Sequence, residues 1–267
     1  MSRVALAALA MLTVGGCEHG AVPPSAPTPH VVRYRLEWTT DGVAKNADAP
    51  GWAVRNDLGY QVRVSRGWVT SYSMELVECP QPTAATPVAA LGALLWSAFE
   101  APAFAGHNAG TPNPAAIRPM QVESLTDPVP HDVGTVTLAP QAYCRLHYLL
   151  ARAGHDSPGL PADLDMVDTT LHVEGTWRAP DTSADVPFTI HTASAYGELF
   201  DHVDGASTFD VDPGRGDLQV VVRRKLGRVF DGVDFAHATE KLTAQRVLES
   251  IVESVEVAIE RGADASR

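Results

Sequence analysis

The side chains best suited to bind a metal in this sequence are its ten histidines. Imidazole nitrogen is a preferred ligand of copper and zinc. Histidines on neighbouring strands can converge without any fixed sequence spacing, so spacing neither confirms nor excludes a shared site. For each one taken alone, a polar surface position or a hydrogen-bonded core position is the alternative interpretation. Three lie at inner positions of expected strands and two in expected loops: His147, His172 and His191, then His107 and His131.

Local signatures of catalysis or nucleotide binding do not occur in the sequence. The phosphate-binding patterns G-x-x-x-x-G-K-S/T and G-x-G-x-x-G are missing, as are the hydrolase elbow G-x-S-x-G and the zinc-protease pattern H-E-x-x-H. A non-local Ser/His/Asp triad is defined by geometry rather than by spacing, so a hydrolase is the least favoured hypothesis. We therefore predict that the protein is not an enzyme.

The first 17 residues have the features of a bacterial lipoprotein signal peptide. Arg3 precedes an apolar run over residues 4–14 that is too short to span a bilayer, and the run ends in Gly-Gly-Cys at residues 15–17. This ending resembles the lipobox, where a peptidase cuts before the cysteine and the cysteine becomes diacylated. We expect Cys17 to anchor the protein to the bilayer of the inner or outer membrane, facing the periplasm or the cell surface. An ordinary signal peptide with a chance cysteine is the alternative.

Two cysteines, Cys79 and Cys144, remain if Cys17 is lipidated. Outside the cytoplasm the environment is oxidising, so an even pair is most simply interpreted as a disulfide. Such a bond would close a loop of about 65 residues and stabilise the fold by about 3–4 kcal/mol in the chain-entropy treatment. The alternative is a cysteine-containing metal or redox site, which the long separation and the lack of C-x-x-C disfavour.

Composition indicates a loop-rich globular protein and excludes some partners. The chain has 267 residues, is 45% hydrophobic and contains 20 prolines and 21 glycines. Its net charge of -12 disfavours binding to nucleic acid. The Pro/Ala-rich residues 18–29 indicate a flexible tether, which leaves a single domain over residues 30–262.

Alternation of polar and apolar residues predicts eight or nine β-strands. Within residues 142–150, Cys144, Leu146 and Tyr148 should share one face, with Tyr143 and His147 on the other. Helical spacing over residues 230–261 predicts a C-terminal helix, with Thr239 as a cap. Because no helix separates the strands, the sequence favours a mainly β fold, an antiparallel β-sandwich (Ig-like or related) with a C-terminal α-helix. The expected strands cover residues 30–39, 60–79, 120–125, 134–138, 142–150, 167–177, 186–193 and 216–226.

A long irregular segment, residues 80–119, interrupts the strands. Segments of this length between strands are uncommon and are usually functional or disordered. The embedded aromatic residues Trp96, Phe99 and Phe104 lead us to expect that it packs against the domain.

Four stretches of the sequence, in this order, resemble a group of uncharacterised bacterial lipoproteins: SMELVEC, FAGHNAGTPN, GTVTLAPQAYCRLHYLL and GLPADLDMVDTTLHVEGTW. They are also distantly similar to the MbnP-like family, copper-binding proteins associated with methanobactin loci. Residues 64–77, 141–143 and 174–175 carry that similarity. It implies an extracytoplasmic β-rich fold linked to copper handling, in some members through histidines and a modified tryptophan.

The leading hypothesis is a lipid-anchored, non-enzymatic, metal-binding protein of the cell envelope, with copper as the expected ion. We rank His107 first as a ligand, because it lies in the long irregular segment, and Trp96 is its expected aromatic neighbour. The expected partner is a copper-handling or other envelope protein. The alternative is a structural or protein-interaction module of the envelope that binds no metal. The other expected ligands are His131, His147 and His172.

Overall fold

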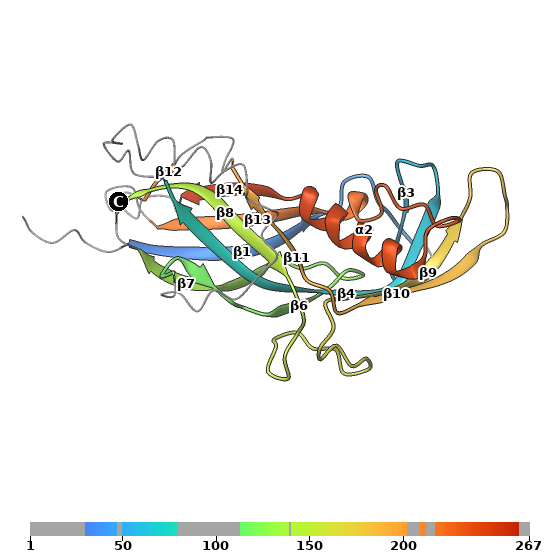
Figure 1. Cartoon of the computed structure of the whole chain (residues 1–267), viewed down its shortest axis with the longest axis horizontal. Helices are drawn as coiled ribbons and strands as arrows, with labels where there is room; N and C mark the ends of the chain where they lie inside the picture. Colours follow the sequence, from blue (N-terminus) through green and yellow to red (C-terminus); the bar gives the residue numbers. More distant parts are fainter. Residues whose placement is uncertain are drawn as a thin grey trace, which may run out of the picture.

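The computed structural model describes residues 30–46, 50–79, 113–138, 140–201, 209–211 and 217–261. Two β-sheets face each other across one hydrophobic core (Figure 1). The smaller sheet has the order β14-β13-β1-β7, and the larger contains ten strands arranged around β4. This architecture confirms the mainly β sandwich with a C-terminal helix.

The smaller sheet brings together strands from the start, the middle and the end of the described chain: β1 His30–Thr39, β7 His131–Leu138, β13 Leu218–Lys225 and β14 Glu256–Arg261. β1 pairs with β7 in antiparallel fashion but with β13 in parallel. β1 and β13 therefore form a parallel pair, whereas the other pairs of named strands are antiparallel, as predicted. Parallel neighbours need a long crossover, and nearly the whole domain lies between these two strands.

The larger sheet is organised by β4 Gln61–Glu78, a single strand of 18 residues. One edge of β4 pairs first with β9 and then with β8, while the other edge pairs with β3, β6 and β5 in turn. The strands around β4 are β2 Ala44–Lys45, β3 Trp52–Arg55, β5 Ala116–Ile117, β6 Gln121–Ser124, β8 Ala142–Leu150, β9 Leu171–Arg178, β10 Val186–Thr192, β11 Tyr196–Phe200 and β12 Phe209–Asp210.

The faces of β8 follow the expected alternation except at its start. Leu146 and Tyr148 are buried in the core, while His147 is half-buried on the opposite face. Tyr143, expected on that opposite face, is instead buried. The pairing of β4 with β8 shifts register between Val77 and Glu78, and an irregularity of this kind changes which face a side chain occupies.

The C-terminal prediction is right for the helix and wrong for the residues after it. Helix α2 spans Glu240–Glu253, and the hydroxyl of Thr239 accepts a hydrogen bond from the backbone N–H of Leu242, as expected of a cap. After the helix the chain forms β14, which pairs with β13. Ile251, Val255 and Ile259 fit the spacing of a helix, but the alternation around Val255 also fits a strand, and the free edge of β13 supplies its hydrogen bonds.

A short 3-10 helix, η2 Leu226–Arg228, precedes α2. Within the part of the chain that the structure describes, no helix has the length and apolar character needed to cross a membrane.

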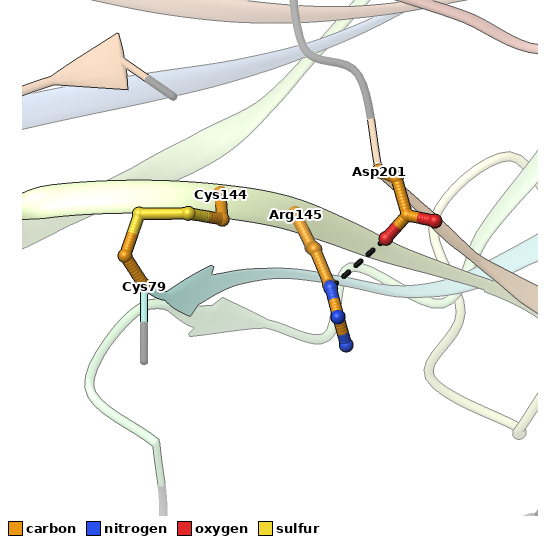
Figure 2. Close-up of a disulfide and its surroundings, with 4 residues drawn as sticks. All are labelled: Cys79, Cys144, Arg145 and Asp201. Atoms are coloured by element: carbon orange, nitrogen blue, oxygen red, sulfur yellow. Dashed lines mark ion pairs between the residues drawn. A yellow bond between two sulfur atoms is a disulfide. The ribbon is translucent and has the colours of Figure 1, made fainter. Parts of the chain in front are cut away.

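A disulfide joins the end of β4 to the start of β8 (Figure 2). Cys79 and Cys144 are bonded with an S–S distance of 2.05 Å and a Cα–Cα distance of 4.9 Å, across a sequence separation of 65. The backbone N–H of Cys79 also donates to the carbonyl of Ala142. Next along β8, the guanidinium of Arg145 lies 2.9 Å from the carboxylate of Asp201. The predicted disulfide is therefore confirmed, and it closes the end of the sheet from which residues 80–112 depart.

Candidate metal-binding residues

The three described candidate ligands lie on three different strands. His131 begins β7 in the smaller sheet, where it pairs with Leu36. His147 and His172 both flank β4 in the larger sheet, on β8 and β9. Among the described ranges, no group of three or more His, Cys, Asp or Glu side chains could hold a metal ion.

His147 and His172 cannot bind the same ion, because β4 holds them apart. His147 pairs with Glu75, and His172 pairs with Trp68. Those two β4 residues are seven positions apart, about 23 Å at 3.3 Å per strand residue.

Several expected features lie outside the described residues. These are the signal peptide with Cys17, the tether, His107 and Trp96. A site shared between His107 and a strand histidine therefore stays a prediction.

His147 lies beside the point where the chain returns from residues 80–112. Its cross-strand neighbour is Glu75, so the two side chains share one face of the sheet. The Asn113 side-chain amide donates to the Glu75 carboxylate at 2.6 Å and to the Leu76 carbonyl at 3.1 Å. Asn113 is the first described residue after the long segment, and these hydrogen bonds place it beside Glu75, the cross-strand neighbour of His147.

Burial lowers the pKa of the His147 imidazole below its ordinary value, and the nearby Glu75 carboxylate opposes only part of that shift. Removing an ionisable group from water disfavours its charged form. The ring is therefore neutral at neutral pH and carries a lone pair. A metal ligand must be in this state, because a protonated imidazole cannot bind a metal.

The shifted pKa of His147 predicts a pH dependence of stability. Because the folded pKa lies below the ordinary value of 6.5, the unfolded chain binds this proton more readily. The contribution of His147 to the free energy of unfolding is complete when the pH is above the pKa of this residue in the unfolded chain. It is lost as the pH falls from there toward the pKa of His147 in the folded protein. Thermal midpoints measured from about pH 7 down to about pH 5 should fall less steeply in His147→Gln than in the unsubstituted protein. Equal slopes would contradict this assignment.

A second group of polar and aromatic side chains forms a row across β4, β9 and β10 on the outer face of the larger sheet. Trp68 pairs with His172, which in turn pairs with His191. The His172 and His191 ring centroids are 5.8 Å apart at an interplanar angle of 70°. The Nε2 atom of His172 lies 2.7 Å from the Oε1 atom of Glu174. The guanidinium of Arg66 lies over the Trp68 ring, 5.1 Å from its centroid.

Sequence reasoning placed both histidines of this row in strands but did not pair them. Their pairing depends on the register between β9 and β10, which the connecting turn sets. His191 was therefore not among the expected ligands.

The core contains a buried ion pair that joins the two sheets. Arg224 of β13, fully buried, contacts the Glu123 carboxylate of β6 with both of its terminal nitrogens, at 2.6 and 2.7 Å. Arg224 also donates to the hydroxyls of Ser71 and Tyr148 and lies over the Trp38 ring, 4.4 Å from its centroid. Sequence analysis did not find this pair. The available signal was Arg223 next to Arg224 in a strand, since neighbours in a strand point to opposite faces.

Burial by itself lowers the pKa of Arg224. Attraction to the Glu123 carboxylate and the hydrogen bonds raise the pKa by more than burial lowers it, so the net pKa lies above its ordinary value. The guanidinium therefore stays charged inside the core. Glu123, Ser71 and Tyr148 accept hydrogen bonds from the guanidinium, and this arrangement leaves no open position for a ligand. We interpret the ion pair as structural.

These features describe a two-sheet, mainly antiparallel β protein with an inter-sheet ion pair, a disulfide and histidines on its strands. No protein-family model matches the chain. No match is found among curated proteins. Among solved structures, MbnP from Methylosinus trichosporium is similar, with 14% identity and a TM-score of 0.33 over 78% of this chain and 79% of that one. A likeness this distant carries no argument about function.

Proposed function

We propose that the protein is a non-enzymatic metal-binding protein of the bacterial cell envelope. In this proposal a copper-type ion is held by His107 together with His147. The observation that carries it is the position of His147, a half-buried neutral imidazole next to the place where the segment containing His107 rejoins the sheet.

Chain connectivity supports the pairing of these two histidines. His107 precedes Asn113 by six residues, which span at most about 20 Å when extended. Asn113 is hydrogen-bonded to Glu75, the direct neighbour of His147. His172 lies about 23 Å further along β4, so His147 is the better placed partner.

The donor chemistry supports copper or zinc over hard cations. Imidazole nitrogen suits these metals, whereas calcium and magnesium prefer oxygen ligands. Both cysteines in the described ranges are bonded to each other, so neither supplies a thiolate.

The proposal includes an anchor and a location. A diacylated Cys17 would hold the domain at the inner or outer membrane, facing the periplasm or the cell surface. A copper-handling or other envelope protein would then be the partner. The lipobox ending and the disulfide support this placement, because disulfides form and persist in oxidising compartments.

The test is the metal content of the chain from residue 18 onward. The purified protein is loaded with Cu(I), Cu(II) or Zn(II), desalted and analysed for metal. We expect about one tightly held copper ion per chain, lost in His107→Ala and in His147→Ala. His237→Ala is the matched control, because His237 is exposed and pairs only with Asp234 among the described residues.

Retention of copper by both variants would contradict the proposed ligands. No retained metal in a protein with an intact fold would leave the alternative, an interaction module of the envelope.

A further inference from the structure

We propose that His172 and His191 form a second metal site, a two-imidazole chelate for a divalent ion of the Cu(II) or Zn(II) class. It lies on the outer face of the larger sheet and is independent of the site proposed for His107 and His147. Imidazole suits both ions, and two donors from adjacent strands can bind one ion while water completes the coordination.

The strand pairing places the two rings at a suitable separation. His172 and His191 are directly opposite each other in the antiparallel pair of β9 and β10. Residues in this relation have Cβ atoms about 4.5–5.5 Å apart. With metal–nitrogen bonds of about 2.0–2.1 Å, two imidazoles on one ion have ring centroids about 5–6 Å apart. The observed 5.8 Å lies in this range, so the spacing of the two strands suits two imidazoles on one ion.

Glu174 prepares His172 for this role. A carboxylate only accepts hydrogen bonds, so the contact at 2.7 Å means that Nε2 of His172 carries the proton and donates it. In the neutral ring the lone pair then lies on Nδ1, and no hydrogen bond to that atom is seen among the described residues. Metal-binding histidines typically donate their other ring N–H to a carboxylate, which fixes the tautomer and the ring orientation. We therefore assign Glu174 as a positioning residue.

The surroundings hold Glu174 in place and leave one side of the chelate open. The Arg66 guanidinium lies 3.7 Å from the Glu174 carboxylate and 2.8 Å from that of Asp163, so Glu174 has a cationic neighbour. His172 is 8% exposed, and Trp68 is its neighbour on β4. His191 is exposed, which gives an ion from solvent access to the pair. With two protein donors this site should bind more weakly than a closed site of three or four ligands.

The experiment is a calorimetric titration of CuSO4 or ZnSO4 into the chain from residue 18 onward. It is repeated in the His107→Ala/His147→Ala variant, where the first proposed site is missing. We expect the His107→Ala/His147→Ala variant to retain one metal-binding event. Adding His191→Ala to that variant should weaken its affinity for the metal by at least about tenfold. Glu174→Gln should weaken it by about 10–100-fold, the usual effect of losing an orienting partner. Adding His155→Ala instead, which removes another exposed histidine, should leave the affinity for the metal unchanged.

Spectroscopy distinguishes chelation from loss of structure. His191 is exposed, so its replacement should leave the circular dichroism and the thermal midpoint without metal unchanged. The Cu(II) electron paramagnetic resonance spectrum of the His107→Ala/His147→Ala variant should show two nitrogen ligands. The spectrum of the same variant with His191→Ala added should show one. Undiminished affinity in His191→Ala would overturn the second site. So would the absence of binding in the His107→Ala/His147→Ala variant, and either result leaves the first proposal standing.

Discussion

Replacing Arg224 by methionine is expected to lower the free energy of unfolding by about 3–5 kcal/mol. The substitution leaves the Glu123 carboxylate buried between the sheets without its cation. Glu123 is 1% exposed and would keep only the hydroxyl of Ser71 as a donor of a hydrogen bond among the contacts seen here. An uncompensated charge in the core costs far more than the loss of a contact at the surface. Chemical denaturation followed by tryptophan fluorescence measures the effect.

The double variant Arg224→Met/Glu123→Leu makes the test specific. Each single substitution should be strongly destabilising, because it leaves one buried charge unpaired. Removing both charges should restore most of the lost stability, because apolar replacements of a buried ion pair are often neutral or stabilising. The hydroxyls of Ser71 and Tyr148, 2.6 Å apart, still form one hydrogen bond with each other. Additive losses in the double variant would contradict the interpretation of a coupled pair.

The exposed ion pair of Arg33 and Asp217 provides the control. Its side chains are 59% and 65% exposed, and its distance is 3.4 Å. Arg33→Met should change stability by no more than about 1 kcal/mol, since solvent screens such pairs. A loss as large as that of Arg224→Met would mean that removal of the guanidinium, and not burial of the charge, decides the outcome.

Removing the disulfide with Cys79→Ser/Cys144→Ser is expected to lower stability by about 3–4 kcal/mol. The bond closes a loop with a sequence separation of 65, and opening it returns conformational freedom to the unfolded chain. For a domain of this size the thermal midpoint should fall by about 10 °C. Differential scanning calorimetry of the two proteins measures the shift.

Two comparisons separate the bond from its surroundings. Reduction of the unsubstituted protein should reproduce the lower midpoint, since it breaks the same bond. Arg145→Ala removes the neighbouring ion pair with Asp201, whose side chains are 44% and 67% exposed, and should change stability little. An unchanged midpoint after complete reduction would show that the closed loop does not stabilise the fold.

Much of the fold could be predicted from the sequence because strand formation leaves a local pattern. β1 and β8 have the predicted bounds, and the expected segments over residues 60–79 form the single strand β4. The Cys79–Cys144 bond could be predicted by counting cysteines once Cys17 was assigned to the lipid anchor. The cap at Thr239 was readable because it depends on one side chain and the adjacent turn.

The errors occurred where distant parts of the chain decide the local structure. β14 forms because β13 offers a free edge, and the same apolar spacing had favoured a longer helix. Tyr143 is buried because the register of β4 and β8 shifts near the disulfide. The parallel pairing of β1 with β13 joins segments nearly two hundred positions apart, as in Val32 with Leu218.

The sequence by itself determined where most of the long strands lie, which cysteines pair and which residue types can bind a metal, since alternation, cysteine parity and imidazole chemistry do not depend on distant contacts. Only the tertiary structure decided which of these residues meet. His147 lies next to Glu75 and Asn113, His172 lies opposite His191, and Arg224 lies against Glu123. The physical reason is register: a shift of one residue between two strands moves every side chain to the other face.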